Sequence, residues 1–369
     1  MKIALVHDYV KEIGGAERVL MALHDMWPEA PVYTAYKFPE YWGYFKEELA
    51  KWDIRESWGA WLPLLPKFIS YYTAISPLFF SEMDLSEYDV VIISATGGYF
   101  PNGVHVGPET KVITYCHTPP RFLYGYETAT KTRHKWYWKP ISDIANHFLR
   151  MVDFYFAQKP TAFVANSKNV ANRIRKFYRR ESEVIYPPID VPQSGKKYEK
   201  EDYYLIISRI VGTKNIELGV TAANKYGFKL KIAGRAIGKS GDEIVRKITG
   251  SNVEYLGEVS EEERDKLLSQ AKGFLALERE ADFGMTTVEP MAYGTPAIAY
   301  RAGGYLETVV DGKTGVFFDE LTVDGVGRAV ERFEKIKWDA KLLQKHAAKF
   351  SKKRFMEEIE RIIEKTVRV

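Results

Sequence analysis

Short apolar runs, each followed by a glycine or polar turn and then by a helical stretch, constrain the fold of this chain more than any other feature. The first is residues 3–6, after which Gly14 and Gly15 mark a turn and apolar residues recur at helical spacing. Residues 90–93 and 111–115 continue the pattern. Apolar runs without alternation are typical of parallel strands that are covered on both faces. The N-terminal half therefore predicts an open α/β sheet.

The pattern breaks at residues 186–190, and the polar, lysine-rich stretch that follows is interpreted as a linker. Strand-like runs then resume with helical stretches between them, at residues 204–207, 229–233, 253–256, 273–277 and 297–300. The fold class predicted is thus α/β, with two Rossmann-like parallel-sheet lobes in tandem. Because ligands of such sheets bind beyond the carboxyl ends of the strands, we expect both lobes to face a central cleft.

The length of 369 residues exceeds what one hydrophobic core usually organises, which supports separate domains. We predict an N-terminal lobe over residues 1–188, a linker over 189–202 and a C-terminal lobe over 203–345. Residues 346–369 are predicted to form a helix that packs back toward the N-terminal lobe. Its single apolar face consists of Phe355, Met356, Ile359, Ile362 and Ile363.

Composition excludes several classes of protein. The net charge of +4 arises from 53 basic and 49 acidic residues, so no nucleic-acid partner is expected. The single cysteine, Cys116, excludes an internal disulfide and a multi-cysteine metal site, and it is expected to serve packing. The N-terminus lacks the pattern of a signal peptide and no apolar run approaches 18 residues, so we predict a cytoplasmic protein that at most lies on a membrane.

Residues 280–296 carry the most specific chemistry. Gly284 follows a predicted strand, and a helix is predicted to start near Thr286, with Pro290 and Glu289 in its first turn. The unpaired amides and the positive dipole end of such a helix suit a diphosphate. Glu289 is then expected to accept hydrogen bonds from a ribose diol.

This segment resembles the signature of the retaining glycosyltransferases of family 4: a glutamate, then Phe-Gly, then a second glutamate on a helix that ends in Gly-x-Pro. The resemblance covers nearly the whole chain. The glycine loop of the family matches residues 14–17, its active-site histidine matches His117, and the Arg and Lys that bind its diphosphate match Arg209 and Lys214. Among relatives, the motifs are most similar to O-antigen-type mannosyltransferases that use GDP-mannose.

The resemblance implies a GT-B fold in which the C-terminal lobe binds the nucleotide-sugar donor and the N-terminal lobe binds the acceptor. It predicts catalytic roles for His117 and for either Glu280 or Asp282. The donor-binding residues predicted are Gly14, Gly15, Arg209, Lys214, Gly234, Leu256, Phe283, Gly284, Met285, Thr286 and Glu289.

One position departs from the family pattern. The family places its two glutamates eight positions apart, and Ala281 stands where the first should be. Either Glu280 or Asp282 supplies the missing contact, or the contact is lost. Asp282 is favoured slightly because it adjoins Phe283 and requires little backbone movement.

Ordinary structural roles compete with these assignments. The two glycines alone would indicate a strand-to-helix turn, and His117 alone would indicate a satisfied structural histidine. Arg209 and Lys214 follow a buried strand, on a loop where cations would offset the charge of a leaving diphosphate, which favours a donor role. No Asp-x-Asp motif occurs, so we expect neither a metal nor a cofactor, only the nucleotide-sugar substrate.

The acceptor side is less specific. Residues 52–80 are rich in aromatic side chains, and residues 121–138 mix aromatic and basic ones. They form either a buried core or an interfacial surface for anionic headgroups or a lipid-linked acceptor. The function predicted is transfer of a hexose, mannose by preference, to a glycan or lipid-linked glycan with retained configuration, as in polysaccharide biosynthesis. A sugar-nucleotide epimerase of the same fold and a non-catalytic partner subunit are the alternatives.

Overall fold

The computed structural model describes residues 1–128, 139–190 and 199–368, which form two compact units. The first unit comprises Met1–Tyr126, Arg133–Pro188 and Lys353–Val369, and the second comprises Glu127–Thr132 and Ile189–Lys352. The predicted linker therefore lies mostly outside the described residues, as do the basic side chains expected between residues 131 and 135.

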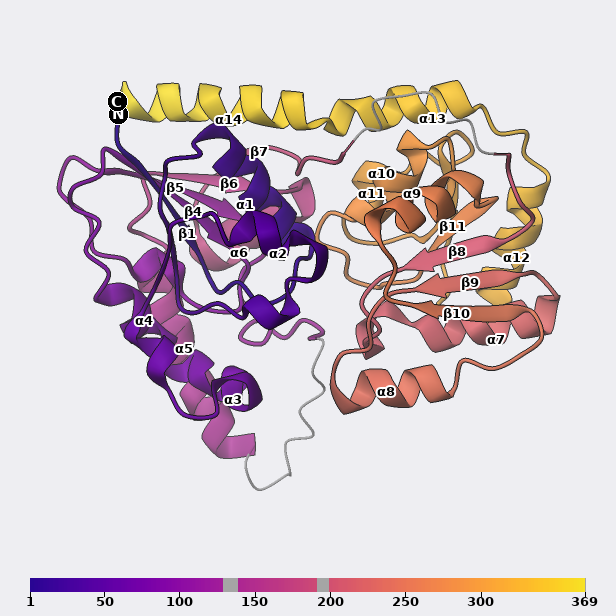
Figure 1. Ribbon diagram of the computed structural model, residues 1–369, viewed down its shortest axis with the longest axis horizontal. Helices are drawn as coiled ribbons and strands as arrows, with labels where there is room; N and C mark the ends of the chain where they lie inside the picture. Colours follow the sequence, from indigo (N-terminus) through magenta and orange to yellow (C-terminus); the bar gives the residue numbers. More distant parts are fainter. Residues whose placement is uncertain (129–138, 191–198, 369) are drawn as a thin grey trace. The chain divides into compact units, whose positions relative to one another are not determined.

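The first unit is built on a parallel sheet of seven strands in the order β3-β2-β1-β4-β5-β6-β7 (Figure 1). The strands are β1 (Ile3–His7), β2 (Val32–Thr34), β3 (Ile54–Glu56), β4 (Val90–Ala95), β5 (Lys111–Cys116), β6 (Ala162–Ala165) and β7 (Glu183–Val184). The three strands predicted here, β1, β4 and β5, are confirmed. The other four were missed because they are only two to four residues long and carry little periodicity.

Both faces of this sheet are covered, as the apolar runs predicted. Ile3 and Leu5 of β1 pack in one core with α1 (Gly15–Met26) and α14 (Lys352–Val367), whereas Ala4 and Val6 face a second core with α4 (Ser76–Ser81). The apolar face of α14 contributes Phe355 to the first core, where its ring centroid lies 5.7 Å from that of Tyr115. The last helix begins at Lys352 rather than at residue 346, because residues 340–350 form α13 and a 3-10 turn.

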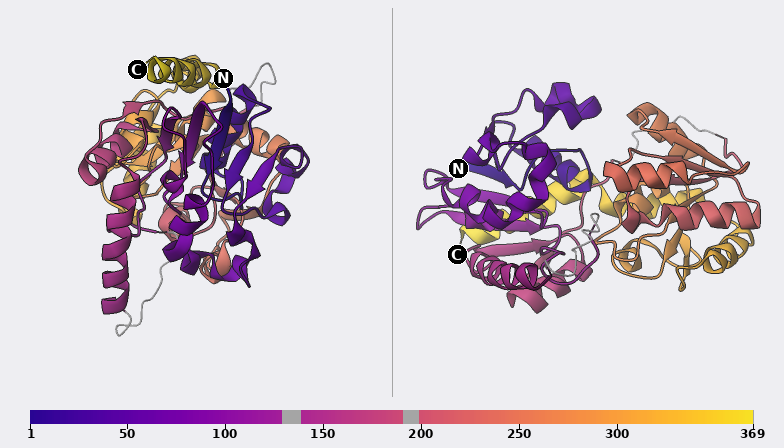
Figure 2. Two further views of the ribbon diagram at one scale, coloured as in Figure 1. Left: turned by 90° about the vertical axis from the view of Figure 1, so that its left-hand side faces the viewer. Right: turned by 90° about the horizontal axis from the view of Figure 1, so that it is seen from below.

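The remaining helices of the first unit lie around this sheet. They are α2 (Lys46–Leu49), α3 (Leu65–Tyr72), α5 (Lys139–Phe156) and α6 (Lys168–Tyr178). The C-terminal part of α5 is held against α6, since Asp153 accepts a hydrogen bond from the Tyr178 hydroxyl at 3.1 Å. Toward its N-terminus α5 extends beyond the strands (Figure 2). Within the described part of the chain, no helix combines the length and the apolarity needed to span a bilayer.

The second unit contains a parallel sheet of six strands in the order β10-β9-β8-β11-β12-β13. The strands are β8 (Tyr204–Ile207), β9 (Leu230–Ala233), β10 (Val253–Gly257), β11 (Gly273–Ala276), β12 (Ala297–Tyr300) and β13 (Gly315–Phe318). Five of them were predicted. β13 was missed because it lies in a segment of glycines and turns.

Alternate residues of these strands enter the main core of the second unit. Tyr204 and Ile206 of β8 pack there with α7, α8 and α12, while Leu205 is buried on the other side. The helices are α7 (Ile216–Tyr226), α8 (Gly238–Arg246), α9 (Glu261–Gln270), α10 (Met285–Ala292), α11 (Tyr305–Thr308), α12 (Val323–Glu334) and α13 (Ala340–Ala347). The α/β class and the two Rossmann-like sheets predicted from the sequence are confirmed.

Candidate active site

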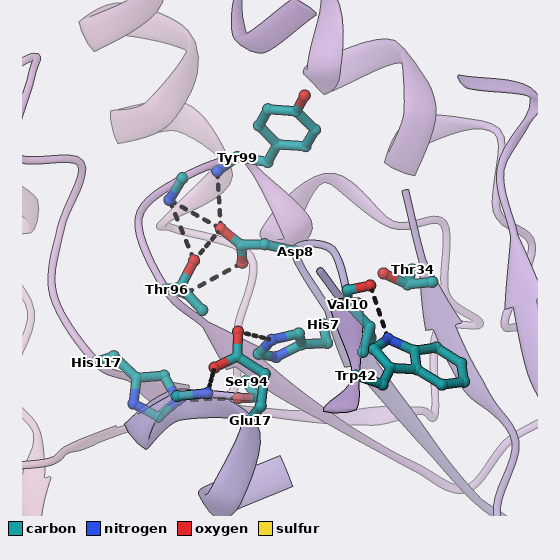
Figure 3. Close-up of polar contacts among 12 residues, drawn as sticks. His7, Asp8, Val10, Glu17, Thr34, Trp42, Ser94, Thr96, Tyr99 and His117 are labelled. Atoms are coloured by element: carbon teal, nitrogen blue, oxygen red, sulfur yellow. Dashed lines mark hydrogen bonds and ion pairs between the residues drawn. The ribbon is translucent and has the colours of Figure 1, made fainter. Parts of the chain in front are cut away.

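The first unit brings its polar residues together where the strand order reverses, between β1 and β4. Ligands of open parallel sheets bind at such a switch point. His7 ends β1 and Asp8 follows it, Ser94 lies near the end of β4, and His117 follows β5 (Figure 3). The predicted His117 is therefore part of a buried polar cluster.

His117 is fixed on several sides. Its Nε2 lies 2.9 Å from the Ser94 hydroxyl, its amide donates to the Ala95 carbonyl at 2.8 Å, and its carbonyl accepts a bond from the Asn166 side chain at 3.0 Å. Burial, assisted by the nearby His7, lowers the pKa of His117 to about 3. The imidazole is therefore neutral at pH 7 and offers hydrogen bonds rather than a fixed charge.

The glycine loop lies at the start of α1, where Gly14 is the N-cap residue. The Gly14 amide donates to Glu17 Oε2 at 2.9 Å, while Glu17 Oε1 lies 3.6 Å from His7 Nε2, which is an ion-pair distance. Burial favours a higher pKa for the Glu17 carboxyl, but the His7 imidazole and the loop amides outweigh it and lower the pKa. The loop is thus tied to the polar cluster through an ionised Glu17.

The second unit has its own switch point, between β8 and β11. Arg209 follows β8 on an exposed loop, and Lys214 ends a 3-10 turn (Gly212–Lys214). The Lys214 ammonium forms an ion pair with Glu278, which follows β11. Next to it, the Asn215 side chain donates to the Leu277 carbonyl at 2.8 Å. Both predicted cations therefore lie at the carboxyl edge of this sheet, where a ligand is expected.

The helix after Gly284 differs from the prediction in its start and in the place of the proline. α10 begins at Met285, and Pro290 lies inside it rather than in its first turn. Gly284 is the N-cap residue with φ of +93°, and a Cβ there would lie 2.6 Å from Cδ1 of the buried Tyr305. Only glycine fits this position without strain.

Glu289 is correspondingly not in the first turn, which corrects a second expectation. Its Oε2 lies 2.5 Å from Nη2 of Arg264 on α9. Burial favours a lower pKa for the Arg264 guanidinium, but Glu289 and Glu261 outweigh it and raise the pKa. A ribose at Glu289 would therefore share the carboxylate with this arginine.

The segment around Ala281 leaves the choice between Glu280 and Asp282 open. Ala281 is buried, and its carbonyl accepts the Gly304 amide at 2.8 Å. Glu280 Oε2 accepts the Glu127 amide at 3.0 Å within the second unit, and Asp282 is half-buried. Both acidic side chains remain candidates for the contact that Ala281 cannot make.

The other predicted donor residues have structural roles as well. Gly234 has φ of +136°, and a Cβ there would lie 1.8 Å from the Ser208 carbonyl oxygen. Leu256 lies at the register shift of β10. Phe283 is buried with its ring centroid 5.5 Å from that of Phe350, and Met285 and Thr286 are half-buried at the start of α10.

The sequence reasoning missed Asp8, Ser94, Glu278 and Arg264. Asp8 follows β1 directly and Glu278 is the second residue after β11, and these positions could have identified them. Arg264 gave no such signal, since it follows three glutamates on a helix that reads as solvated. Among the residues that the structure describes, no group of three or more His, Cys, Asp or Glu could hold a metal ion.

Two family models match adjacent regions of the chain. Residues 13–193 match the model described as Glycosyltransferase Family 4, and residues 190–354 match Glycosyl transferases group 1. Together the two models span residues 13–354, and both describe glycosyltransferases. The chain is a family 4 glycosyltransferase. The resemblance to family 4 glycosyltransferases, stated from the sequence motifs, is thereby confirmed.

A curated relative agrees with this membership, and solved structures show the fold. An alpha-1,3/1,6-mannosyltransferase ALG2 from Kluyveromyces lactis is 25% identical over 373 residues, covering 84% of this chain and 71% of the relative. Among solved structures, a sucrose-phosphate synthase from Thermosynechococcus elongatus has a TM-score of 0.69 at 14% identity and covers 99% of both chains. Anabaena Alr3699/HepE in complex with UDP has a TM-score of 0.68 at 17% identity, covering 99% of this chain and all of that one. The GT-B fold is confirmed.

Proposed function

We propose that this glycosyltransferase transfers mannose from a nucleoside diphosphate, GDP-mannose by preference, to a hydroxyl of a glycan or lipid-linked glycan with retained configuration. The ALG2 relative supports mannose, because its name states that activity. The family membership supports a nucleotide-sugar donor and a glycan acceptor. Such a reaction belongs to polysaccharide biosynthesis.

The observation that carries this proposal is the switch point of the second unit, where Lys214, Arg209 and the N-terminus of α10 all belong to loops at the carboxyl ends of the strands. A diphosphate bound there would meet two cations and the positive end of a helix dipole. These groups would stabilise the negative charge that develops on the leaving diphosphate. Glu278 forms an ion pair with Lys214 and so holds its side chain at this edge of the sheet.

His117 would act on the sugar rather than on the diphosphate. Its imidazole is neutral at pH 7, because burial keeps its pKa low. A neutral ring accepts or donates a hydrogen bond without repelling the positive charge that develops at the anomeric carbon. In the proposed reaction the leaving phosphate takes the acceptor proton, so the protein supplies positioning and electrostatics.

Turnover of a Lys214→Ala variant tests the donor site. Because this change leaves the Glu278 carboxylate without its ammonium partner, the Lys214→Ala, Glu278→Gln double variant separates loss of charge from local destabilisation. Lys225→Ala is the matched control, since Lys225 also forms an ion pair in the second unit but lies exposed on α7. We expect both Lys214 variants to lose at least 100-fold in kcat/KM, as for other oxyanion-stabilising groups. Full activity in the double variant would refute the assignment.

The donor and the stereochemistry need separate measurements. A thermal-shift panel of GDP, UDP and ADP sugars should show the largest rise in Tm with GDP-mannose, because a ligand that binds the native state stabilises it. A response to a UDP sugar alone would overturn that choice. NMR of the product should show retained configuration at the anomeric carbon. Conversion of the donor without an acceptor would instead indicate an epimerase.

A peripheral membrane contact forms the second part of the proposal, with the protein at the cytoplasmic face of an anionic membrane. The aromatic segment of residues 52–80 divides between two roles: Phe79 and Phe80 are buried in the core, whereas Trp61 and Tyr71 are exposed. A second exposed apolar surface was not predicted. It is a stripe along one side of α5, made of Ile144, Phe148, Met151 and Tyr155.

The charge of the adjoining helix favours an anionic membrane as the partner of this stripe. The stripe lies opposite the buried Asp153, through which α5 contacts α6. The exposed basic residues of α6 and its C-cap are Lys168, Arg175, Lys176 and Arg179. Surfaces that bind anionic lipids typically combine exposed apolar side chains with cations, and α5 and α6 supply one of these each.

Vesicle sedimentation tests the membrane contact. The protein should sediment with vesicles that contain phosphatidylglycerol and much less with pure phosphatidylcholine. Phe148→Glu should reduce this binding, whereas Ala145→Glu adds the same charge at an exposed position of α5 outside the stripe. Equal binding of the two variants would exclude the stripe as the contact.

A further inference from the structure

Asp8 is a buried carboxylate with an unusual number of donors. It follows β1 directly and is fully buried. Its Oδ1 accepts the Thr96 amide at 3.0 Å, and its Oδ2 accepts the Thr96 hydroxyl at 2.7 Å and the amides of Gly98 and Tyr99 at 2.9 and 2.7 Å (Figure 3). All four donors belong to the turn that follows β4. Asp8 therefore ties this turn to the end of β1.

The same turn contacts the segment that carries His117. Gly97 has φ of +75°, and a Cβ there would lie 2.6 Å from the Thr118 carbonyl oxygen. One residue before the turn, the Ala95 carbonyl accepts the His117 amide, and Ser94 binds the His117 ring. Residues 94–97 thus contact residues 117–118 in three ways: through the Ser94 side chain, through the Ala95 carbonyl and through the close approach of Gly97 to the Thr118 backbone.

Asp8 cannot contact a substrate in this arrangement, because its side chain is enclosed and both carboxylate oxygens are occupied by the turn. The hydrogen bonds of Asp8 lead to the His117 segment by way of this turn. Displacing a reacting group by about 1 Å is enough to reduce turnover by about 100-fold. A residue that fixes this turn would therefore affect the chemical step without touching the sugar.

We propose that Asp8 is a positioning residue: its carboxylate fixes the Thr96–Tyr99 turn, and through that turn it holds Ser94 and His117 in the arrangement that sugar transfer requires. The catalytic consequence rests on the proposed function, in which His117 contacts the donor sugar. The structural link between Asp8 and the His117 ring does not depend on the proposed function.

Asp8→Asn is the direct test, because it keeps the size of the side chain but points an NH2 group at donors that need an acceptor. We expect kcat to fall at least 10-fold, while KM for the donor changes less than twofold, since Arg209 and Lys214, the two cations predicted to bind the diphosphate, belong to the second unit. Asp25→Asn, an exposed change on α1, should leave both constants unchanged.

A milder pair of variants keeps the test valid if Asp8→Asn fails to fold. Thr96→Val removes only the hydroxyl that donates to Asp8, whereas Thr96→Ser retains it. We expect Thr96→Val to lower kcat at least threefold and Thr96→Ser to restore the wild-type value. Equal kcat values for these two variants would overturn the proposal.

A spectroscopic measurement separates positioning from general destabilisation. In 15N-labelled histidine spectra, the ring signals of His117 should shift in Asp8→Asn and Thr96→Val but not in Thr96→Ser or Asp25→Asn. Unchanged His117 signals in a folded Asp8→Asn protein would refute the link. If wild-type protein transfers no sugar, the proposed function fails, and these spectra still decide whether Asp8 controls the His117 ring.

Discussion

Replacing His117 with glutamine should remove an acid-sensitive contribution to the stability of the first unit. Burial lowers the pKa of this imidazole from 6.5 to about 3 in the folded protein. The unfolded chain therefore binds a proton at pH values where the folded chain does not. This contribution is complete above pH 6.5 and is lost as the pH falls toward 3.

The magnitude follows from the pH interval. In the unfolded chain His117 becomes protonated as the pH falls below its pKa of 6.5, whereas the folded side chain stays neutral down to pH 5. The interval that counts, from pH 6.5 to pH 5, is about 1.5 pH units. At about 1.4 kcal/mol per unit, the loss of stability is about 2 kcal/mol. His117→Gln should lack this part of the pH dependence.

Urea unfolding followed by tryptophan fluorescence measures the effect in the right unit, because every tryptophan except Trp338 falls in the sequence ranges of the first unit. The free energy of unfolding should fall by about 2 kcal/mol more in wild type than in His117→Gln between pH 8 and pH 5. His105→Gln, an exposed histidine of the same unit, should behave as wild type. Identical pH dependence in wild type and His117→Gln would refute a neutral, buried His117.

Three further predictions concern stability. Phe355→Ala removes a fully buried ring through which α14 packs in the first unit, and should shift the fluorescence-detected urea transition by about 3–5 kcal/mol. Burial raises the pKa of Asp153 from 3.8 to about 7, so the stability that the protonated side chain contributes below pH 3.8 is lost as the pH rises through 7. Asp153→Asn, which cannot ionise, should therefore stabilise the protein in urea unfolding at pH 8 but not at pH 4. Gly284→Ala should cost about 1–3 kcal/mol more than Gly227→Ala in thermal unfolding, because both glycines have positive φ but only at Gly284 would a Cβ meet a side chain, that of Tyr305.

The features of the fold and of the candidate site that could be predicted from the sequence are those that depend on residues close together along the chain. The strands β1, β4, β5, β8 and β12 could be predicted because each is a local apolar run, and Gly14, Lys214 and Gly284 could be predicted because each follows such a run. Motif resemblance added His117. None of these inferences requires knowledge of which residues meet in space.

What only the tertiary structure decided is the set of partners. Asp8 meets Tyr99, 91 positions away, and Glu289 meets Arg264 on another helix, so its carboxylate is already shared. Lys214 likewise meets Glu278, 64 positions away. Sequence periodicity reports the environment of a residue along its own strand or helix, whereas these pairs form because parallel strands bring their carboxyl ends to one edge or because helices pack. The sequence by itself therefore determined the two sheets and the edges at which a ligand is expected, and the packing of those sheets decided which charges are paired there.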